Sequence, residues 1–319
     1  MSKIYNSELA FEADVVEVLQ KHGRSPEVIK NPTEKDLIQN WKNILFANNN
    51  TRQKLNWCPL TDSEMDQILN QLKNKSVLDL NSNFINAVSI AITRDNPDDT
   101  LNYGKEIRLH IYNRKEIAAW SSIYQIVEQP KFDKKNKILP DRRWDILLLI
   151  NGMPVIHIEL KKSWVPVHQA STQIQKYHKE GMFTGIFSLV QIFVAMTPEE
   201  TLYFANPWNR EEFDRKFFFH WADFNNNPIN EWTEVVEKLL SIPMAHMLIG
   251  FYTIADNGDS KLKVLRSYQY YAANAIANKV SKAKHHHERQ KGGFIWHTTG
   301  SWKTMTSFKT APLIAASND

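Results

Sequence analysis

The amino-acid sequence predicts an α/β protein in which helices flank a mixed sheet. Two apolar runs of strand length lie on either side of Asn151-Gly152, a pair that favours a tight hairpin turn. The stretches 7–21 and 167–180 have the pattern of helices, and the first has its apolar residues at helical spacing. A strand, a loop and a helix are expected in that order over residues 293–316. The chain therefore holds at least the beginning of a second folding unit.

Composition is typical of a soluble globular protein. The 319 residues are enough for two domains or one large one, and 42% are hydrophobic while 23% are charged. The net charge of +4 and a pI near 8.9 permit an anionic partner without requiring one. The single cysteine, Cys58, excludes an internal disulfide framework and fits a reducing cytosol. No segment has the pattern of a signal peptide or a membrane span, so we expect a cytoplasmic protein with no membrane partner.

The ends of the two apolar runs carry the residues best suited to chemistry. Asp145 opens the first run, and the second closes with Glu159-Leu160-Lys161. Because side chains alternate faces along a strand, Glu159 and Lys161 project from the same side. Two carboxylates beside an ammonium group form a place where hard oxygen ligands can hold Mg²⁺. Lys161 would then position water or stabilise charge on a phosphate.

The register of this hairpin decides whether such a site can form. A strict two-residue turn pairs Asp145 with Ile158 and puts it on the face opposite to Glu159. A three-residue loop, or a bulge in either strand, brings Asp145 directly across from Glu159. A metal site therefore requires an irregular hairpin. The alternative is a buried hairpin whose terminal charges are merely solvated.

The next helix adds the pattern by which a family can be recognised. Over 167–180, Gln173 and Tyr177 stand four residues apart on one face. An acid, Glu-x-Lys after a hairpin, and Gln-x-x-x-Tyr on the following helix resemble the nuclease core of the PD-(D/E)xK superfamily, in its RecB-like branch. Three longer segments are similar to the restriction (R) subunit of type I restriction-modification enzymes: RRWDILLLINGMPVIHIELKKS, QIQKYHKEG and GGFIWHTTGSWKTMTSFKTA. That subunit is much longer, so the chain corresponds to about its N-terminal third.

This resemblance implies a Mg²⁺-dependent DNA endonuclease. Asp145 and Glu159 would bind the metal, with the backbone carbonyl of Leu160 as a further ligand. Lys161 would activate water or stabilise the transition state, and Gln173 and Tyr177 would support the site and contact DNA. The intact prokaryotic subunit is expected to join modification and specificity subunits. It would move double-stranded DNA using ATP and cut far from the recognition sequence.

Further site candidates precede the hairpin. RecB-like nucleases often place an additional acid on the first helix, which makes Glu12 a candidate, although a solvated helix face is the simpler expectation. The loop 129–143 carries basic residues that would contact DNA phosphates next to the metal site, or would simply be solvated. The candidates in it for DNA binding are Lys134, Lys135, Arg142 and Arg143. Pro140-Asp141 spells the superfamily's name but lies in this loop, so Asp145 is the acid we assign.

The remaining elements of the first unit follow from standard signals. Helices are expected from Thr33 to about Phe46 and after Thr61, where Glu64 completes a capping box. The stretches 107–112 and 124–127 alternate like strands that feed the central sheet. Two more core strands are expected at 189–195 and 202–205, separated by a turn at 197–200.

A second unit is expected after the turn-rich segment 257–259. We therefore divide the chain into a RecB-like nuclease domain, 1–256, and the truncated start of a RecA-like, helicase-type ATPase domain, 257–319. Gln269 resembles the adenine-sensing glutamine of superfamily 2 helicases, at the start of a helix over 268–280. A buried strand at 293–297, a loop at 298–304 and a helix at 305–316 are the context of a phosphate-binding loop.

The loop itself departs from the family at one position. The nucleotide-binding candidates are Gln269, Thr298, Gly300, Ser301, Lys303 and Thr304. The family has Gly where this chain has Trp302, and an indole there must either swing outward or fill the space of the phosphates. We therefore expect ATP, a cofactor of the full-length subunit, to bind this chain very weakly or not at all.

Two competing functions remain open on the residues alone. In a non-catalytic docking or structural module of a DNA-processing complex, the acids would be surface charge and Mg²⁺ would not be needed. An autonomous ATPase is the other reading. The chain ends before any later acidic motif for Mg²⁺-ATP, which argues against that function.

Overall fold

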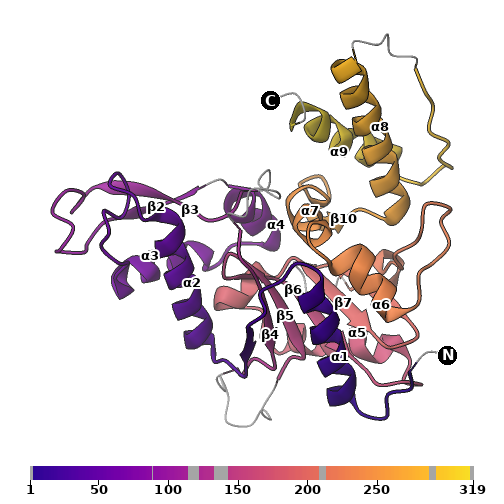
Figure 1. Cartoon of the computed structure of the whole chain (residues 1–319), viewed down its shortest axis with the longest axis horizontal. Helices are drawn as coiled ribbons and strands as arrows, with labels where there is room; N and C mark the ends of the chain where they lie inside the picture. The colour runs from indigo at the N-terminus through magenta and orange to yellow at the C-terminus, as the bar shows by residue number, and fades with distance from the viewer. Residues whose placement is uncertain are drawn as a thin grey trace.

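The computed structural model describes residues 3–87, 89–113, 122–132, 143–207, 213–286 and 292–316 (Figure 1). Six strands of this described chain form one mixed sheet in the order β1-β4-β5-β6-β7-β8, as the α/β expectation required. β1 pairs with β4, and β6 with β7, in parallel, and the other neighbours are antiparallel. The strands are β1 (Val28–Lys30), β4 (Tyr124–Glu128), β5 (Ile146–Ile150), β6 (Met153–Leu160), β7 (Ile192–Met196) and β8 (Thr201–Ala205).

The centre of the sheet is buried on both faces. Every residue of β5, β6 and β7 is buried, so these strands are apolar throughout rather than alternating. The helices expected around them are present as α1 (Glu8–Lys21), α2 (Glu34–Asn49), α3 (Asp62–Leu72) and α5 (Val167–Lys179). Capping boxes start α2 at Thr33 and α3 at Thr61, the second as the sequence predicted. None of the described helices is both long and apolar enough to cross a bilayer.

The β5–β6 hairpin is irregular, as a metal site requires. Asn151 and Gly152 form the two-residue turn with φ of +51° and +84°. The register then shifts, because Leu148 pairs with Ile156 and leaves Val155 as an extra residue in β6. Beyond this bulge Ile146 pairs with Ile158. The next position on each strand is Asp145 and Glu159, so these two acids face each other across the hairpin.

A lobe formed by α2, α3 and a ribbon of two strands lies beside the sheet (Figure 1). In the described chain, β2 (Ser89–Thr93) and β3 (Glu106–His110) pair only with each other. The expectation that 107–112 feeds the central sheet was therefore wrong, because alternation identifies a strand but not its partner. A buried ion cluster lies within this lobe: the guanidinium of Arg94 is 2.5 Å from the carboxylate of Glu64 and 2.8 Å from that of Asp99.

The C-terminal part is mainly helical. The turn expected at 257–259 joins the antiparallel strands β9 (Thr253–Asp256) and β10 (Lys261–Val264). The helix expected at 305–316 is present and begins two residues earlier. The other helices and helical turns of the described chain are α4 (Val77–Leu80), η1 (Asn81–Ile85), η2 (Gly185–Leu189), η3 (Arg215–Phe217), α6 (Trp232–Val235), η4 (Val236–Leu240), α7 (Met244–Gly250) and α8 (Ser267–His286), and the helix at 303–316 is α9 (Lys303–Ala316).

One expected strand is missing from this part. Within the described segment 292–298 there is no regular structure, and Phe294 and Trp296 are 88% and 87% exposed. The prediction of a buried strand at 293–297 was therefore wrong. A strand needs a neighbouring strand for its backbone groups, whereas α8 and α9 are what this segment connects.

Candidate active site

Asp145 stands at the entrance of β5, opposite Glu159. The backbone N–H of Leu160 donates a hydrogen bond to Asp145 Oδ2 over 2.7 Å, which fixes the carboxylate against the neighbouring strand. Burial, followed by the charge of Glu159, holds the pKa of Asp145 well above its ordinary value. The two acids are thus close enough to repel each other when both are ionised.

Glu159 is completely buried near the end of β6. In the described structure neither of its carboxylate oxygens has a hydrogen-bond partner. Burial raises the pKa of Glu159 to about 8, and the charge of Lys161 offsets this only in part. A buried carboxylate with so little compensation is costly to ionise, unless a cation binds to it.

Lys161 holds its ammonium among three oxygens at this end of the hairpin. Its Nζ donates to the carbonyl oxygen of Leu160 over 2.7 Å, and lies 3.5 Å from both Glu159 Oε1 and Glu8 Oε1. The site therefore already accommodates one positive charge. The same oxygens include two of the three that we expect to bind Mg²⁺.

Gln173 and Tyr177 reach the same place from α5. The buried Tyr177 donates its hydroxyl hydrogen to the carbonyl oxygen of Arg143 over 3.1 Å, and Gln173 Nε2 donates to that hydroxyl oxygen. Arg143 lies two residues before Asp145, so Tyr177 anchors the segment that leads into the acid. The structure thus brings together all five residues that the sequence placed in the site.

The burial of Glu12, on α1, corrects one prediction about this region. We expected a solvated helix face, but Glu12 is only 4% exposed and accepts a 3.0 Å hydrogen bond from Gln129 Nε2. Burial, with a smaller contribution from the charge of Asp145, raises the pKa of Glu12 to about 7. Helical periodicity did not indicate that Glu12 is buried, because periodicity does not show that α1 packs close to the ends of the strands.

Glu8 and His157 were not predicted as parts of the site. Glu8 is the half-exposed partner of Lys161 described above. His157 is buried with its Nε2 3.3 Å from Glu159 Oε2, and burial lowers its pKa to about 3. The imidazole is therefore neutral and adds no positive charge. Strand alternation already put His157 on the face of Glu159 and Lys161, so this signal was available in the sequence.

The donor set fits a hard divalent ion. No three Asp, Glu, His or Cys side chains converge on one point anywhere in the described residues. An ion here would instead take Asp145, Glu159 and the Leu160 carbonyl, and Mg²⁺ commonly keeps water in its other positions. The observation that favours such an ion is the fully buried carboxylate of Glu159, whose charge is only partly compensated by Lys161.

The basic loop before Asp145 is only partly described. Lys134, Lys135 and Arg142 lie outside the described residues. Arg143 is exposed, and its backbone forms an isolated bridge with Lys131. Of these four candidates for DNA binding, one thus lies beside the site with its side chain available to solvent.

The candidate nucleotide loop lies between α8 and α9. Gln269 is buried; its Oε1 accepts from the backbone N–H of Arg266 over 3.0 Å. Gly300 has a φ of +81°, and the Ser301 hydroxyl donates to the carbonyl of Thr298 over 2.7 Å. The other two candidates are exposed in the first turn of α9: Lys303 and Thr304.

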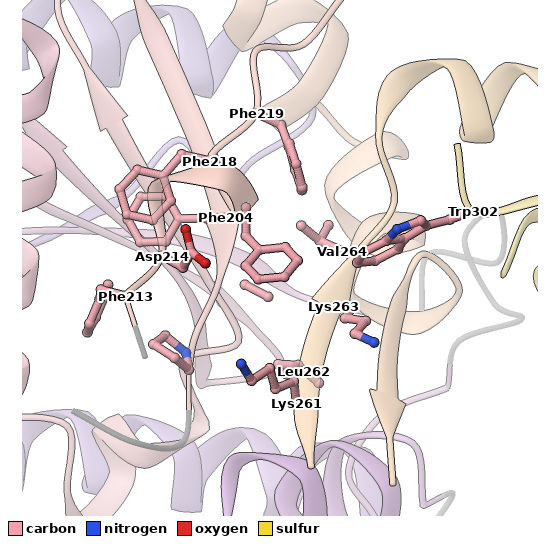
Figure 2. A pocket seen from close by; sticks show the side chains of 13 residues that line it. Phe204, Phe213, Asp214, Phe218, Phe219, Lys261, Leu262, Lys263, Val264 and Trp302 are labelled. Atoms are coloured by element: carbon pink, nitrogen blue, oxygen red, sulfur yellow. The ribbon is translucent and has the colours of Figure 1, made fainter. Parts of the chain in front are cut away.

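Trp302 points away from this loop. Its φ is +56°, a region that favours glycine, and its ring centroid lies 5.9 Å from that of Phe217. Lys263 Nζ lies 4.9 Å from the ring centroid of Trp302, and Figure 2 shows both residues lining one hollow beside β10. Of the two alternatives for the indole, the structure has the outward one.

Comparison with known proteins now shows the family. A model described as "Type I restriction enzyme R protein N terminus" matches residues 9–212, and one described as "SWI2/SNF2 ATPase" matches residues 268–319. An endonuclease subunit of a type I restriction enzyme from Staphylococcus saprophyticus is 31% identical over 316 residues, which are 99% of this chain and 31% of that protein. A corresponding subunit from Staphylococcus aureus is 30% identical over the same coverage.

A more distant relative extends the match. A putative type I restriction endonuclease subunit from Methanocaldococcus jannaschii is 24% identical over 257 residues, 79% of this chain and 23% of that protein. The chain spans about a third of the length of the staphylococcal relatives. The family model covers more than half of the chain, including the whole hairpin and α5. The chain belongs to the family of type I restriction enzyme R proteins.

Proposed function

We propose that this chain is the nuclease part of a type I restriction enzyme R subunit and hydrolyses DNA phosphodiester bonds with Mg²⁺. The observation that carries the proposal is the pair Asp145 and Glu159, set face to face by the bulge in β6. Both carboxylates are costly to ionise where they are, and the Leu160 N–H on Asp145 and the ammonium group of Lys161 compensate them only in part. The relatives named as endonuclease subunits support the same activity.

Each residue has a distinct role in this proposal. Asp145, Glu159 and the carbonyl of Leu160 would hold the ion, which when bound polarises a phosphoryl oxygen and lowers the pKa of water. Lys161 places a positive charge where negative charge develops on the phosphate. Tyr177 holds the segment before Asp145 through the Arg143 carbonyl, and Gln173 holds Tyr177. With these roles the five residues would form the PD-(D/E)xK arrangement in its RecB-like form.

The wider activity is also a proposal, since the chain spans about a third of its relatives. The intact cytoplasmic subunit would join modification and specificity subunits, and a RecA-like motor starting near residue 257 would move double-stranded DNA using ATP. The match of residues 268–319 to SWI2/SNF2 ATPases supports the motor. The basic residues of the 129–143 loop would hold the DNA backbone at the nuclease site.

The proposal is tested by Lys161→Ala in the full-length enzyme. We expect cleavage of circular DNA to be lost while ATP-driven translocation continues, because the motor is a separate unit. Lys73→Ala, which removes an exposed lysine from the end of α3, is the matched control and should cut normally. Cleavage by Lys161→Ala at the control rate would exclude its catalytic role. If the chain were instead a docking module, its binding to DNA would not depend on Mg²⁺ in either variant.

A further inference from the structure

Trp164 is an exposed indole beside the candidate nuclease site. It lies three residues after Lys161, in the connection from β6 to α5, and is 77% exposed. Its φ is +68°, where a side chain other than that of Gly, Asn or Asp is strained. Neither the exposure nor the backbone conformation stabilises the free chain. Strained residues of this kind cluster at functional sites.

Hydrogen bonds hold the backbone on both sides of Trp164. Ser163 is buried and exchanges two hydrogen bonds with Tyr5: its N–H donates to the Tyr5 carbonyl over 3.1 Å, and its hydroxyl oxygen accepts from the Tyr5 N–H over 3.0 Å. The N–H of Val165 donates to the Lys162 carbonyl over 3.3 Å, which closes a turn around Trp164. A side chain displayed in this way loses little conformational freedom when it binds a partner.

The helix that follows Trp164 in the chain has a surface with the chemistry of a DNA contact. A polar stripe on α5 lines an open groove of about 400 Å³ and contains no acid: Gln169, Thr172, Gln173 and Lys176. These positions share one helix face, and Gln173 connects the stripe to Tyr177. Lys162, directly before the Ser163 anchor, is exposed. Ammonium, amide and hydroxyl donors of this kind bind phosphates and sugars.

We propose that Trp164 packs against the sugars and base edges of duplex DNA at the nuclease site, while Lys162 and the α5 stripe contact the phosphates. This inference rests on the proposed nuclease function and extends it to how the substrate is held. The contact is apolar and independent of base sequence. It would position the strand relative to Asp145 and Lys161 rather than take part in bond cleavage.

The test is the affinity of the 319-residue chain for a fluorescein-labelled duplex, measured by anisotropy with Ca²⁺ replacing Mg²⁺. Trp164→Gly suits the left-handed backbone, so it should fold at least as stably as the wild type, as a thermal melt would show. We expect about tenfold weaker binding, the usual loss when an interface tryptophan is removed. Trp57→Gly is the matched control. Trp57 is 63% exposed with a φ of +61°, but it lies in the connection between α2 and α3.

Salt dependence separates the apolar contact from the ionic one. Trp164→Gly should weaken binding without changing the slope of log affinity against log salt, whereas Lys162→Gln should reduce that slope by about 1. Wild-type affinity in Trp164→Gly, or an equal loss in Trp57→Gly, would overturn the inference. It would also fail if Trp164→Gly lost only its assembly with the modification and specificity subunits, or if the wild-type chain bound no duplex.

A separate experiment distinguishes a failure of the proposed nuclease function from a failure of the Trp164 contact. Asp145→Asn in the full-length enzyme should lose cleavage of circular DNA in Mg²⁺. If Asp145→Asn cuts normally, the nuclease assignment fails, whatever Trp164 does. If Asp145→Asn is inactive and Trp164→Gly binds like the wild type, the nuclease function stands and the Trp164 contact is refuted.

Discussion

Replacing Glu159 with Gln is expected to stabilise the metal-free chain at alkaline pH while removing its response to Mg²⁺. Burial raises the pKa of Glu159 from its ordinary value of 4.5 to about 8. Between these two values the folded chain keeps a proton that the unfolded chain has released. The free energy of unfolding therefore falls as pH rises from about 4.5 to about 8, and levels off above that.

The size of the effect follows from the same pKa values. One pKa unit corresponds to about 1.4 kcal/mol, so ionising Glu159 costs the folded state at most about 5 kcal/mol at pH 8.5. Gln is neutral at every pH, but its amide lacks hydrogen-bond partners at this position, which costs about 1–3 kcal/mol. We expect a net gain of about 1–3 kcal/mol at pH 8.5. The gain should shrink toward pH 5, because the cost accumulates only as pH rises above the ordinary pKa of 4.5 and is still small at pH 5.

Thermal melts at pH 5, 7 and 8.5 in EDTA, repeated with Mg²⁺, measure both effects. The wild type should lose stability toward pH 8.5 and regain it with Mg²⁺, by about 2.7 kcal/mol when the ion exceeds its Kd a hundredfold. Glu159→Gln should show a flatter pH profile and no gain from Mg²⁺. Glu199→Gln, at an exposed turn position, should behave like the wild type. Parallel pH profiles for wild type and Glu159→Gln would refute the reasoning, as would equal stabilisation of both by Mg²⁺.

Three other changes test the rest of the structure. Trp302→Gly removes the indole and suits the φ of +56°, so calorimetry should detect ATP binding to the variant and very little to the wild type; equally tight binding by both would contradict the expectation. Glu64→Ala removes one of the two carboxylates beside the buried Arg94, so the free energy of unfolding measured in urea should fall by about 3–5 kcal/mol. A fall below about 1 kcal/mol would show that Arg94 needs only its other partners. Gly152→Ala puts a Cβ 2.8 Å from Trp41 Cα at a φ of +84°, so the hairpin should distort; an unchanged melting temperature and Mg²⁺ response would show that this turn does not set the site.

The geometry of the candidate site was largely predictable because it is local. Asn151-Gly152 specifies where the hairpin turns, and alternation assigns Glu159 and Lys161 to one face. Counting residues from that turn showed that Asp145 could reach this face only through an irregularity. The structure has the two-residue turn and places the irregularity at Val155. The position of the bulge itself was not predictable, since either strand could have carried it.

Elements whose place depends on distant contacts were predicted less well. The stretch 107–112 has the alternation of a strand, yet its partner is β2 rather than the central sheet. The stretch 293–297 is apolar enough for a buried strand, but no neighbouring strand is available to it in the described chain. Glu12 lies on a helix whose periodicity was clear, while its burial depends on where α1 crosses the sheet. For 107–112 and for the helix of Glu12 the local pattern was correct in kind and silent about the partner, whereas the strand predicted at 293–297 does not form.

The same distinction separates the two candidate sites in this chain. Asp145, Glu159 and Lys161 come from one hairpin, and the support from Tyr177 comes from the helix that follows it directly. The nucleotide loop instead depends on a strand that does not form here and on a backbone turn that Trp302 occupies at a glycine-like φ. The described contacts of this loop and of α9 with the first unit include the ring of Phe217 beside Trp302 and the carbonyl oxygen of Thr253, which accepts from Lys309 Nζ. The five residues predicted for the nuclease site therefore all come from the hairpin and α5, and none of the described contacts of Trp302 involves them.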